Sequence, residues 1–436
     1  MQDKQDKNLT IVTPDASRRR VLQAGAAAVA TLGFPYLNTA FAQAGRKLKI
    51  GYVSPETGPL AAFGEADKFI IGTIREMWKG GLVAGGKTYP VEIIVKDSQS
   101  NPNRAGEVAA DLILKDKVDI MLAGGTPETT NPVADQSELN EIPCVTTVCP
   151  WQPWFFGRGG KPDQGFNWTY HYFWGLEDII AVFTNMWNSL PTNKQVGGLF
   201  PNDGDGNAWG DPNLGFPKPL AAQGYKLNDP GRYQNLTQDF SAQISSFKKA
   251  NNEIITGVVI PPDFKTFWTQ AAQQGYKPKI ASVGKALLFP AAVEAIGPTA
   301  DGLSTEVWWS PTHPFKSSLN GMSAQALADS FEKGTGKQWT QPIGFVHSLF
   351  EVAADALKRA KNIDDKASIR DAIAGTNLNT IVGPLSWGKG PMKNVAKTPL
   401  VGGQWVKGKK NKFDLAIVNN QTAPNIPTTA KLKPIS

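Results

Sequence analysis

The stretch GLVAGGKT, residues 81–88, has the glycine spacing and the final Lys-Thr pair of a phosphate-binding loop, whose chemistry is to hold a nucleotide. Such a loop follows a strand and opens a helix, because the free N–H groups of the first helical turn hold the phosphates. Here the helical pattern ends at Trp78, and the β-branched run YPVEIIVKDS follows the glycines. The order therefore predicts a glycine-rich connection from a helix to a strand rather than a nucleotide site.

Metal and catalytic motifs are incomplete. The stretch DGDGNAWG offers oxygen ligands at alternate positions, as calcium loops do, but Ala208 replaces the required glycine and Leu214 replaces the final glutamate. The two cysteines and three histidines do not have zinc or iron spacing. G-x-S-x-G and H-E-x-x-H motifs are also absent from the sequence. We predict no catalytic residue, no metal site and no cofactor.

The two cysteines, Cys144 and Cys149, lie five positions apart in IPCVTTVCPW. In an extended chain their Cα atoms would lie well beyond the roughly 7 Å limit for a disulfide, so a bridge would need a turn between them. Two buried thiols are the simpler prediction, and their oxidation state stays open.

Aromatic side chains are concentrated between residues 151 and 174, and Trp209, Trp308 and Trp309 follow near other strand ends. A single aromatic residue is more often part of a core than of a site. In open α/β sheets, however, ligands bind beyond the carboxyl ends of the strands. The loops at those ends are GGTPETT, VCPWQPW, PNDGDGNAW, IPPDF and VGKAL. We expect these loops to form a pocket with aromatic walls.

The elements that must position this pocket follow an alternating pattern from Lys47 onward. Short β-branched apolar runs alternate with segments of helical spacing, which predicts parallel sheets covered by helices. The expected strands are KLKIGYVS, YPVEIIVKDS, VDIMLAG, IPCVTTV, VGGLFPN, ITGVVIPP and KIASVG. The expected helices span 63–79, 102–116, 130–140, 177–190, 212–223, 239–250, 264–275, 321–334 and 343–361.

The chain falls into two comparable α/β halves, the first closing near residue 173. The helix pair after residue 320 and the segment IVGPLSWGKG have no sheet of their own, so we expect them to return to the earlier halves. We predict an α/β fold of two doubly wound, Rossmann-like lobes joined by a hinge of several crossings. The expected division is 45–173 plus 306–385 for lobe 1, and 174–305 plus 386–436 for lobe 2.

Size and charge set further limits. The 436 residues carry a formal charge of +7, and the length is sufficient for two or three domains. The densest basic run is Lys407, Lys409, Lys410 and Lys412, which is typical of a solvated surface. We predict no nucleic-acid binding.

The N-terminal segment, residues 1–44, resembles a twin-arginine export signal. The stretch SRRRVLQAGAAAVATLGFPYLNTAFAQA has paired arginines, a modest apolar run and small residues at its end. Cleavage after Ala42 or after Ala44 would fit the small-residue rule. Polar residues and a proline interrupt the apolar run, which disfavours a membrane anchor. We expect a periplasmic protein whose signal is removed.

Four motifs resemble one family. SPETGPLAAFGE, KDSQSNPNRAGEVAADLI, VGPLSWGKG and PLVGGQWVKG are similar to stretches of the type I periplasmic solute-binding proteins of ABC transporters, in the branched-chain amino acid group. The resemblance runs from about Lys47 to about Lys410. It implies two lobes that close over a small-molecule ligand by hinge motion, and partner permease and ATPase subunits in the inner membrane.

The resemblance also implies ligand-binding positions. Phe63 and Trp209 match aromatic residues that flank the ligand. Pro127 stands where amino acid binders place a serine for the ligand carboxylate, and Thr126 is a nearby substitute. Lys285 stands where those relatives carry an acid that pairs with the α-ammonium. A lysine there would repel an ammonium and attract a carboxylate.

We therefore expect a solute with an acidic group and a flat body, stacked between Phe63, Trp151 and Trp209 and paired with Lys285. Trp174 is expected to line the same pocket. A sugar, an amide or urea-like solute and a free amino acid remain alternatives for the ligand. A ligand-sensing domain and a secreted α/β enzyme remain alternatives for the function.

Overall fold

The computed structural model describes residues 45–435, so the expected export signal lies outside the described residues. Within this range, no helix combines the length and the apolar character needed to cross a membrane.

The first sheet has six parallel strands in the order β15-β7-β6-β5-β1-β4. Its strands are β1 (Leu48–Ser54), β4 (Val91–Asp97), β5 (Ile120–Gly124), β6 (Cys144–Thr147), β7 (Thr169–Tyr172) and β15 (Val395–Ala396). The helices around it are α2 (Asp67–Met77), α3 (Pro102–Leu114), α4 (Pro127–Leu139), α5 (Trp151–Phe155), α12 (Ala324–Thr335), α13 (Pro342–Arg359) and α14 (Lys366–Ala374). A short 3-10 helix, η1 (Ala61–Gly64), precedes α2.

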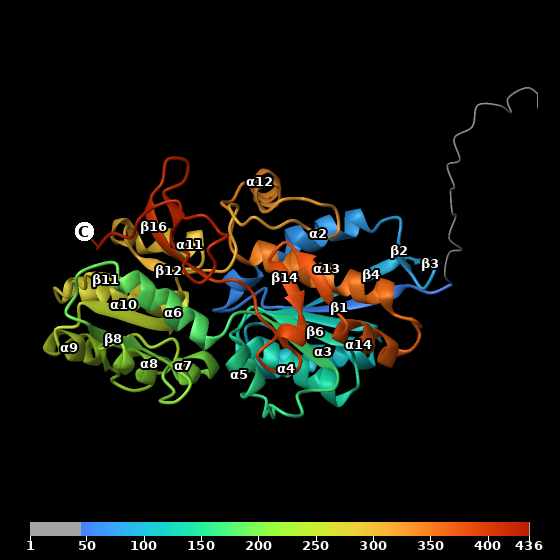
Figure 1. Ribbon diagram of the computed structural model, residues 1–436, viewed down its shortest axis with the longest axis horizontal. Helices are drawn as coiled ribbons and strands as arrows, with labels where there is room; N and C mark the ends of the chain where they lie inside the picture. The colour runs from blue at the N-terminus through green and yellow to red at the C-terminus, as the bar shows by residue number, and fades with distance from the viewer. Residues whose placement is uncertain (1–44, 436) are drawn as a thin grey trace, which may run out of the picture. The chain divides into compact units, whose positions relative to one another are not determined.

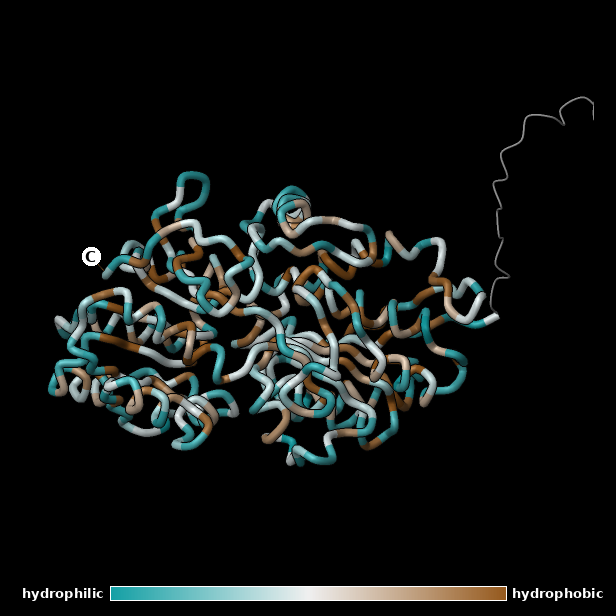
Figure 2. Tube along the Cα trace, in the orientation of Figure 1, coloured by the Kyte–Doolittle hydropathy of each residue, from teal (hydrophilic) through white to brown (hydrophobic). Residues whose placement is uncertain are grey.

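The first sheet is covered on both faces, as a parallel sheet requires. Ile50 and Tyr52 of β1 pack in one buried cluster with residues of α2 and α13. Val53 points to the other face and packs in a second cluster with α3 and α4. In Figure 2 hydrophobic stretches run along the strands, whereas the outer helices carry hydrophilic stretches. The alternation along each strand therefore gives this lobe two cores.

The second sheet has seven strands in the order β17-β16-β12-β11-β10-β8-β9, of which β16 and β17 are antiparallel to their neighbours. Its strands are β8 (Gln195–Leu199), β9 (Lys226–Asn228), β10 (Ile254–Val259), β11 (Ile280–Lys285), β12 (Ser304–Val307), β16 (Val401–Lys407) and β17 (Phe413–Asn419). Its helices are α6 (Leu176–Trp187), α7 (Gly204–Trp209), α8 (Pro217–Ala222), α9 (Ser241–Lys249), α10 (Pro261–Gln273) and α11 (Pro290–Ile296), with the 3-10 helix η2 (Pro298–Ala300) after α11.

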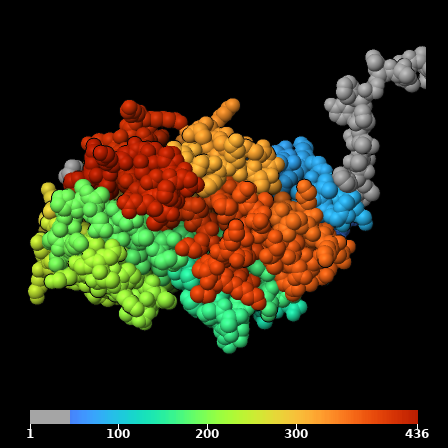
Figure 3. All heavy atoms as spheres, in the orientation of Figure 1, coloured from blue at the N-terminus to red at the C-terminus, as the bar shows by residue number. Residues whose placement is uncertain are grey.

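The chain passes between the two sheets after β7, after β12 and after β15. Figures 1 and 3 show the result: the red C-terminal strands lie beside green and yellow residues of the second lobe, and the orange helix α13 lies beside the first. These crossings confirm the predicted two-lobe α/β fold. The lobe boundaries at residues 173 and 305 stay predictions. Near the C-terminus, β15 (Val395–Ala396) pairs with β7 of the first sheet, whereas β16 and β17 extend the second sheet.

GLVAGGKT forms a β-hairpin, β2 (Leu82–Ala84) and β3 (Lys87–Tyr89), that leads into β4. Gly85 and Gly86 have φ values of 53° and 75°, which is the conformation of a two-residue type I′ turn. The glycines lead into strands and not into a helix, so the predicted helix-to-strand connection is confirmed. The two short strands within this connection were not predicted. A second hairpin pairs β13 (Asn377–Thr380) with β14 (Gly383–Ser386), followed by η3 (Trp387–Lys389).

Several helices begin earlier than the sequence pattern indicated. The helix α4 begins at Pro127 rather than near 130, and α10 begins at Pro261 rather than near 264. Proline is favoured at the first helical position, because an N–H group there would have no acceptor within the helix and its absence costs nothing. DGDGNAWG forms the short helix α7, and the Asp203 side chain accepts a hydrogen bond from Gly206 N at 2.7 Å at its start. Cys144 and Cys149 are both buried free thiols.

Candidate functional site

A small cavity lies between the two lobes, where strand ends of both sheets meet. Its lining residues are Phe63, Thr126, Val148, Pro150, Phe173, Trp174, Asp205, Trp209, Val258, Lys285, Leu288, Glu306 and Trp308. They lie at the carboxyl-terminal ends of strands of both sheets or in the segments that follow these strands, as expected for doubly wound sheets. The cavity volume is about 20 Å³, room for about one water molecule, so the side chains of both lobes nearly fill it.

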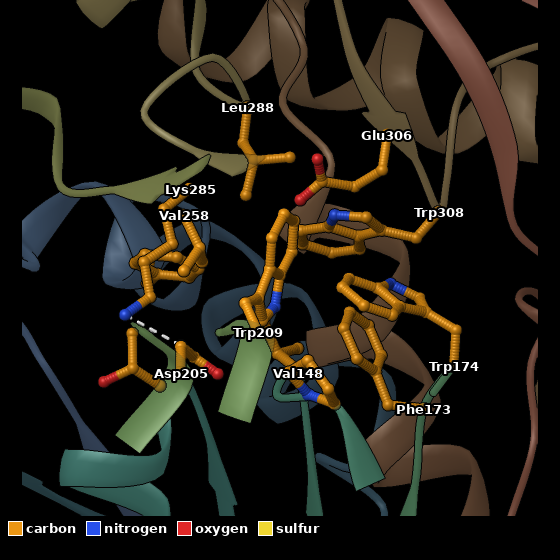
Figure 4. Close-up of a pocket in the computed structure, with 13 residues that line it drawn as sticks. Val148, Phe173, Trp174, Asp205, Trp209, Val258, Lys285, Leu288, Glu306 and Trp308 are labelled. Carbon is orange, nitrogen blue, oxygen red and sulfur yellow. Dashed lines mark ion pairs between the residues drawn. The ribbon is translucent and has the colours of Figure 1, made fainter. Parts of the chain in front are cut away.

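Aromatic rings form one wall of the cavity. Phe173 lies 4.9 Å from Trp174 and 5.4 Å from Trp308 between ring centroids, the latter edge to face. Trp209 comes from α7 of the second lobe and stacks on Phe216 at 5.0 Å. Gly284 permits this position, since a Cβ there would lie 3.0 Å from the Trp209 ring. Figure 4 shows the three indoles together, apart from Lys285 and Asp205.

Four residues that line this cavity each have a buried hydrogen-bond donor without a partner in the described chain. The donors are the indole Nε1 groups of Trp174, Trp209 and Trp308 and the hydroxyl of Thr126, none of which has a hydrogen-bond partner within residues 45–435. A buried polar group without a partner costs about 1–3 kcal/mol. Four such groups around one cavity are therefore well placed to receive hydrogen-bond acceptors.

An ion cluster lies at the opposite side of the cavity. The Lys285 ammonium is 2.7 Å from Asp205 Oδ2 and 3.3 Å from Asp203 Oδ2, and all three side chains are at most 6% exposed. Burial alone would lower the pKa of Lys285, but Asp203 and Asp205 raise it well above its ordinary value. Burial raises the pKa of Asp205 to about 7 despite the lysine, and Glu128 and Asp203 also raise it. Lys285 thus has two carboxylate partners inside the protein, which the sequence did not indicate.

Glu306 is a second buried carboxyl group at the cavity. One of its oxygens accepts a hydrogen bond from the Thr305 hydroxyl at 2.8 Å. Burial, and to a smaller extent the nearby Asp205 carboxyl group, raise the pKa of Glu306 to about 7. Asp205 and Glu306 therefore both keep their protons to a higher pH than an exposed carboxyl group does.

The backbone is strained at two lining positions. Val148 after β6 and Lys285 at the end of β11 have φ values of 74° and 61°, in the left-handed region. This region costs a non-glycine residue about 1–2 kcal/mol, and it is an outlier for a β-branched side chain. Each lobe thus holds one strained residue against the cavity, as binding sites often do.

The structure brings five of the seven expected site residues to this cavity: Phe63, Thr126, Trp174, Trp209 and Lys285. Whether they bind a ligand stays a prediction.

The other two expected residues do not line the cavity. Pro127 lines a separate groove outside it. The Trp151 indole donates to Glu177 Oε1 at 3.2 Å and packs against Phe155 and Phe156 in a neighbouring cluster. The α5 helix turns this ring away from the cavity lining.

The other lining residues were not among the expected site residues, and four of them carry aromatic or carboxyl side chains: Phe173, Asp205, Glu306 and Trp308. Trp308 and Phe173 stood among the aromatic residues near strand ends, and Asp205 stood in the rejected calcium motif. Nothing in the sequence indicated Glu306 as a site residue. Its strand β12 has the polar sequence STEV, which does not predict a buried strand, yet all four residues are buried.

Comparisons with known proteins agree with this architecture. The profile of the periplasmic binding protein family matches residues 47–410. A leucine binding protein from Thermotoga maritima superposes with a TM-score of 0.69 at 21% identity, covering 86% of this chain and 99% of that chain.

Two further solved structures are similar. An ABC transporter solute binding protein from Rhodopseudomonas palustris, in complex with 3,4-dihydroxybenzoic acid, has a TM-score of 0.68 at 18% identity over 87% of this chain and 99% of that chain. The isoleucine complex of a branched-chain amino acid transporter substrate binding protein from Streptococcus pneumoniae has a TM-score of 0.68 at 16% identity, over 86% of this chain and 100% of that chain. Since the profile spans most of the chain, this chain belongs to the periplasmic binding protein family, with its two-lobe type I fold.

Proposed function

We propose that this protein is the substrate-binding component of an ABC importer, and that it captures a small solute in the inter-lobe cavity by hinge closure. The family match and the structural neighbours named as ABC transporter binding proteins support this role. In this proposal the protein acts without catalysis in the periplasm, after removal of an export signal within residues 1–44. It delivers its solute to a permease and an ATPase in the inner membrane.

The solute presents hydrogen-bond acceptors, as a carboxylate or an amide does. The observation that carries this part is the set of four unpartnered donors, namely the three indole N–H groups and the Thr126 hydroxyl. Two aspartates already neutralise Lys285, so a ligand carboxylate would have to compete with them. The cavity as it stands has room for about one water molecule, so the lobes must part to admit the solute. We place its acceptor end at the indoles and its flat body between Phe63 and Trp209. An aromatic acid has both the acceptors and the flat body. An amide, a urea-like solute or an amino acid has the acceptors but not the flat body.

The test is a thermal-shift screen of the mature chain against 4-hydroxybenzoate, succinate, leucine, glucose and propionamide. A solute that binds only the native state stabilises it by about 2.7 kcal/mol at 100 times its Kd. The strongest binder is then titrated against Trp308→Phe, which keeps an aromatic ring and removes the N–H donor.

Trp309→Phe is the matched control, because Trp309 is also fully buried with an unpartnered indole N–H but does not line the cavity. Loss of one hydrogen bond of about 1 kcal/mol predicts roughly fivefold weaker binding for Trp308→Phe and unchanged binding for the control. Equal effects of the two substitutions would refute the donor role. Glucose as the strongest binder, with no acid or amide response, would refute the proposed solute chemistry.

A further inference from the structure

A second, larger hollow lies outside the inner cavity, and we call it the outer groove. Its volume is about 490 Å³, within the usual range for small-molecule sites. Its walls come from α4 and α5 of the first lobe and from α7 and the loop after it in the second. Figure 1 shows α7 beside α5 and α4, and these helices are in contact. An occupant of the outer groove would therefore touch both lobes.

The outer groove shares its chain segments with the inner cavity. Thr126 lines the cavity and Pro127 the groove, and the same division holds within 150–153, 174–176 and 204–209. The lobes also meet here directly, since Gly204 N donates to Glu128 Oε1 at 2.7 Å. The groove is thus a feature of the arrangement in which the two lobes are in contact.

Much of the wall is apolar and accessible to solvent. The Phe156 side chain is 36% exposed and Leu214 is 49% exposed, and both lie among the few exposed large hydrophobic residues of the described chain. Proline rings also line the groove, of which Pro132 is partly exposed and Pro127 and Pro153 are buried. An exposed apolar surface at a concave site marks a binding surface more often than a scattered exposed leucine does.

The charged groups that line the outer groove are both carboxylates. Glu128 and Asp211 line it, and neither forms an ion pair within residues 45–435. No lysine or arginine of that range lines it either. The nearby Lys285 is already shared by Asp203 and Asp205, which leaves this region with more carboxylates than cations.

Asn131 adds a further acceptor. Its Oδ1 atom is buried in the groove wall without a hydrogen-bond partner in the described chain, while its Nδ2 donates to Pro153 O at 3.1 Å. A carboxylate-rich apolar groove is thus present on a protein whose formal charge is +7.

We propose that the outer groove is a second binding site, for a small organic cation with an apolar body. The apolar part lies between Phe156 and Leu214, and the ammonium faces Asp211 and Glu128. Because such a cation contacts both lobes, its binding favours the arrangement in which they touch. This site is independent of the solute in the inner cavity.

The experiment measures the affinity of three probes of equal length by isothermal titration calorimetry: 4-phenylbutylammonium, neutral 4-phenylbutanol and anionic 4-phenylbutyrate. We expect the ammonium to bind, the alcohol to bind several-fold more weakly and the butyrate to bind least. The ammonium affinity should fall as salt rises, since exposed charges are screened.

Two substitutions locate the probe. Asp211→Asn keeps the oxygen that accepts from Asn213 N and Leu214 N, and it should weaken ammonium binding roughly two- to fivefold while leaving the alcohol unchanged. Leu214→Ser should weaken the ammonium and the alcohol alike.

The matched controls are Asp163→Asn and Leu236→Ser, exposed residues outside the groove. No binding of the ammonium, binding of the alcohol with equal affinity, or effects of the groove variants equal to those of the controls would each overturn the proposal. Trp308→Phe should leave ammonium binding unchanged; loss of ammonium binding in this variant would place the probe in the inner cavity and overturn the second site. Failure of the solute screen leaves this test intact.

Discussion

Glu306→Gln should stabilise the protein at alkaline pH and have little effect at acid pH. The Glu306 side chain is buried, and its pKa is raised from an ordinary value of 4.5 to about 7, first by burial and then by the Asp205 charge. The folded state therefore binds one more proton than the unfolded state between these two values. Stability falls as pH rises through this window, and the loss is complete above about pH 7.

The magnitude follows from the interval between the two pKa values. At 1.36 kcal/mol per pH unit, the charged Glu306 costs about 3 kcal/mol above pH 7 relative to its neutral form. Glutamine is neutral at every pH, and its amide oxygen still accepts from the Thr305 hydroxyl. For a chain of this length about 3 kcal/mol corresponds to roughly 3–6 °C in Tm.

The assay is a pair of melting curves for the wild type and Glu306→Gln at pH 4.5, 6, 7 and 8. The difference in Tm should be near zero at pH 4.5 and grow to its full value at pH 8. Buried histidines affect both proteins equally, so the comparison isolates Glu306. Glu107→Gln on the exposed side of α3 is the control and should show no trend. A difference that is independent of pH, or a wild type that is more stable at pH 8, would refute the burial argument.

Two further substitutions probe the same site. Lys285→Met should lower the free energy of unfolding by about 3–5 kcal/mol at pH 8 in urea denaturation, because it leaves two buried aspartates without their cation. Lys47→Met, which removes an exposed ion pair, should cost at most about 1 kcal/mol, and equal costs would contradict the buried cluster. Gly284→Ala should weaken solute binding and shift the intrinsic fluorescence of Trp209, because its Cβ would lie 3.0 Å from that ring. Gly388→Ala, which meets open space, should change neither quantity, and identical spectra for both variants would contradict the close approach.

Most apolar strands could be predicted from the sequence, whereas two polar strands could not. Runs such as VDIMLAG and ITGVVIPP became β5 and β10 at nearly the expected bounds. β12 lies inside the second sheet, between β16 and β11, but has the sequence STEV, and β7 has the sequence TYHY. Both are fully buried and stabilised by hydrogen bonds such as Thr147 Oγ1 to Tyr172 O, which leave no hydrophobic pattern in the sequence.

The position of the cavity could be predicted from the sequence, but the charge balance of its lining could not. The rule that ligands bind at strand ends located the aromatic wall, because it depends only on the order of elements. The partners of Lys285 lie about 80 positions earlier in the chain, so only the folded structure brings them together. Both Trp151 and Trp174 were expected at the cavity, but only Trp174 lines it. The direction in which α5 turns the Trp151 ring cannot be derived from the spacing of residues in the sequence.

The repeated passage of the chain between the sheets also constrains how the protein folds. β7 pairs with β15 more than 200 residues later, and β12 pairs with β16 about 100 residues later. Neither sheet can gain its full set of strands until the ribosome has released nearly the whole chain. Contacts this distant in sequence slow folding, because a long loop must close before any stabilising contact forms. Until β15 and β16 have been synthesised, β7 and β12 each keep one edge without a partner strand. A chain stopped before residue 395 would therefore be prone to pair with other chains along β7.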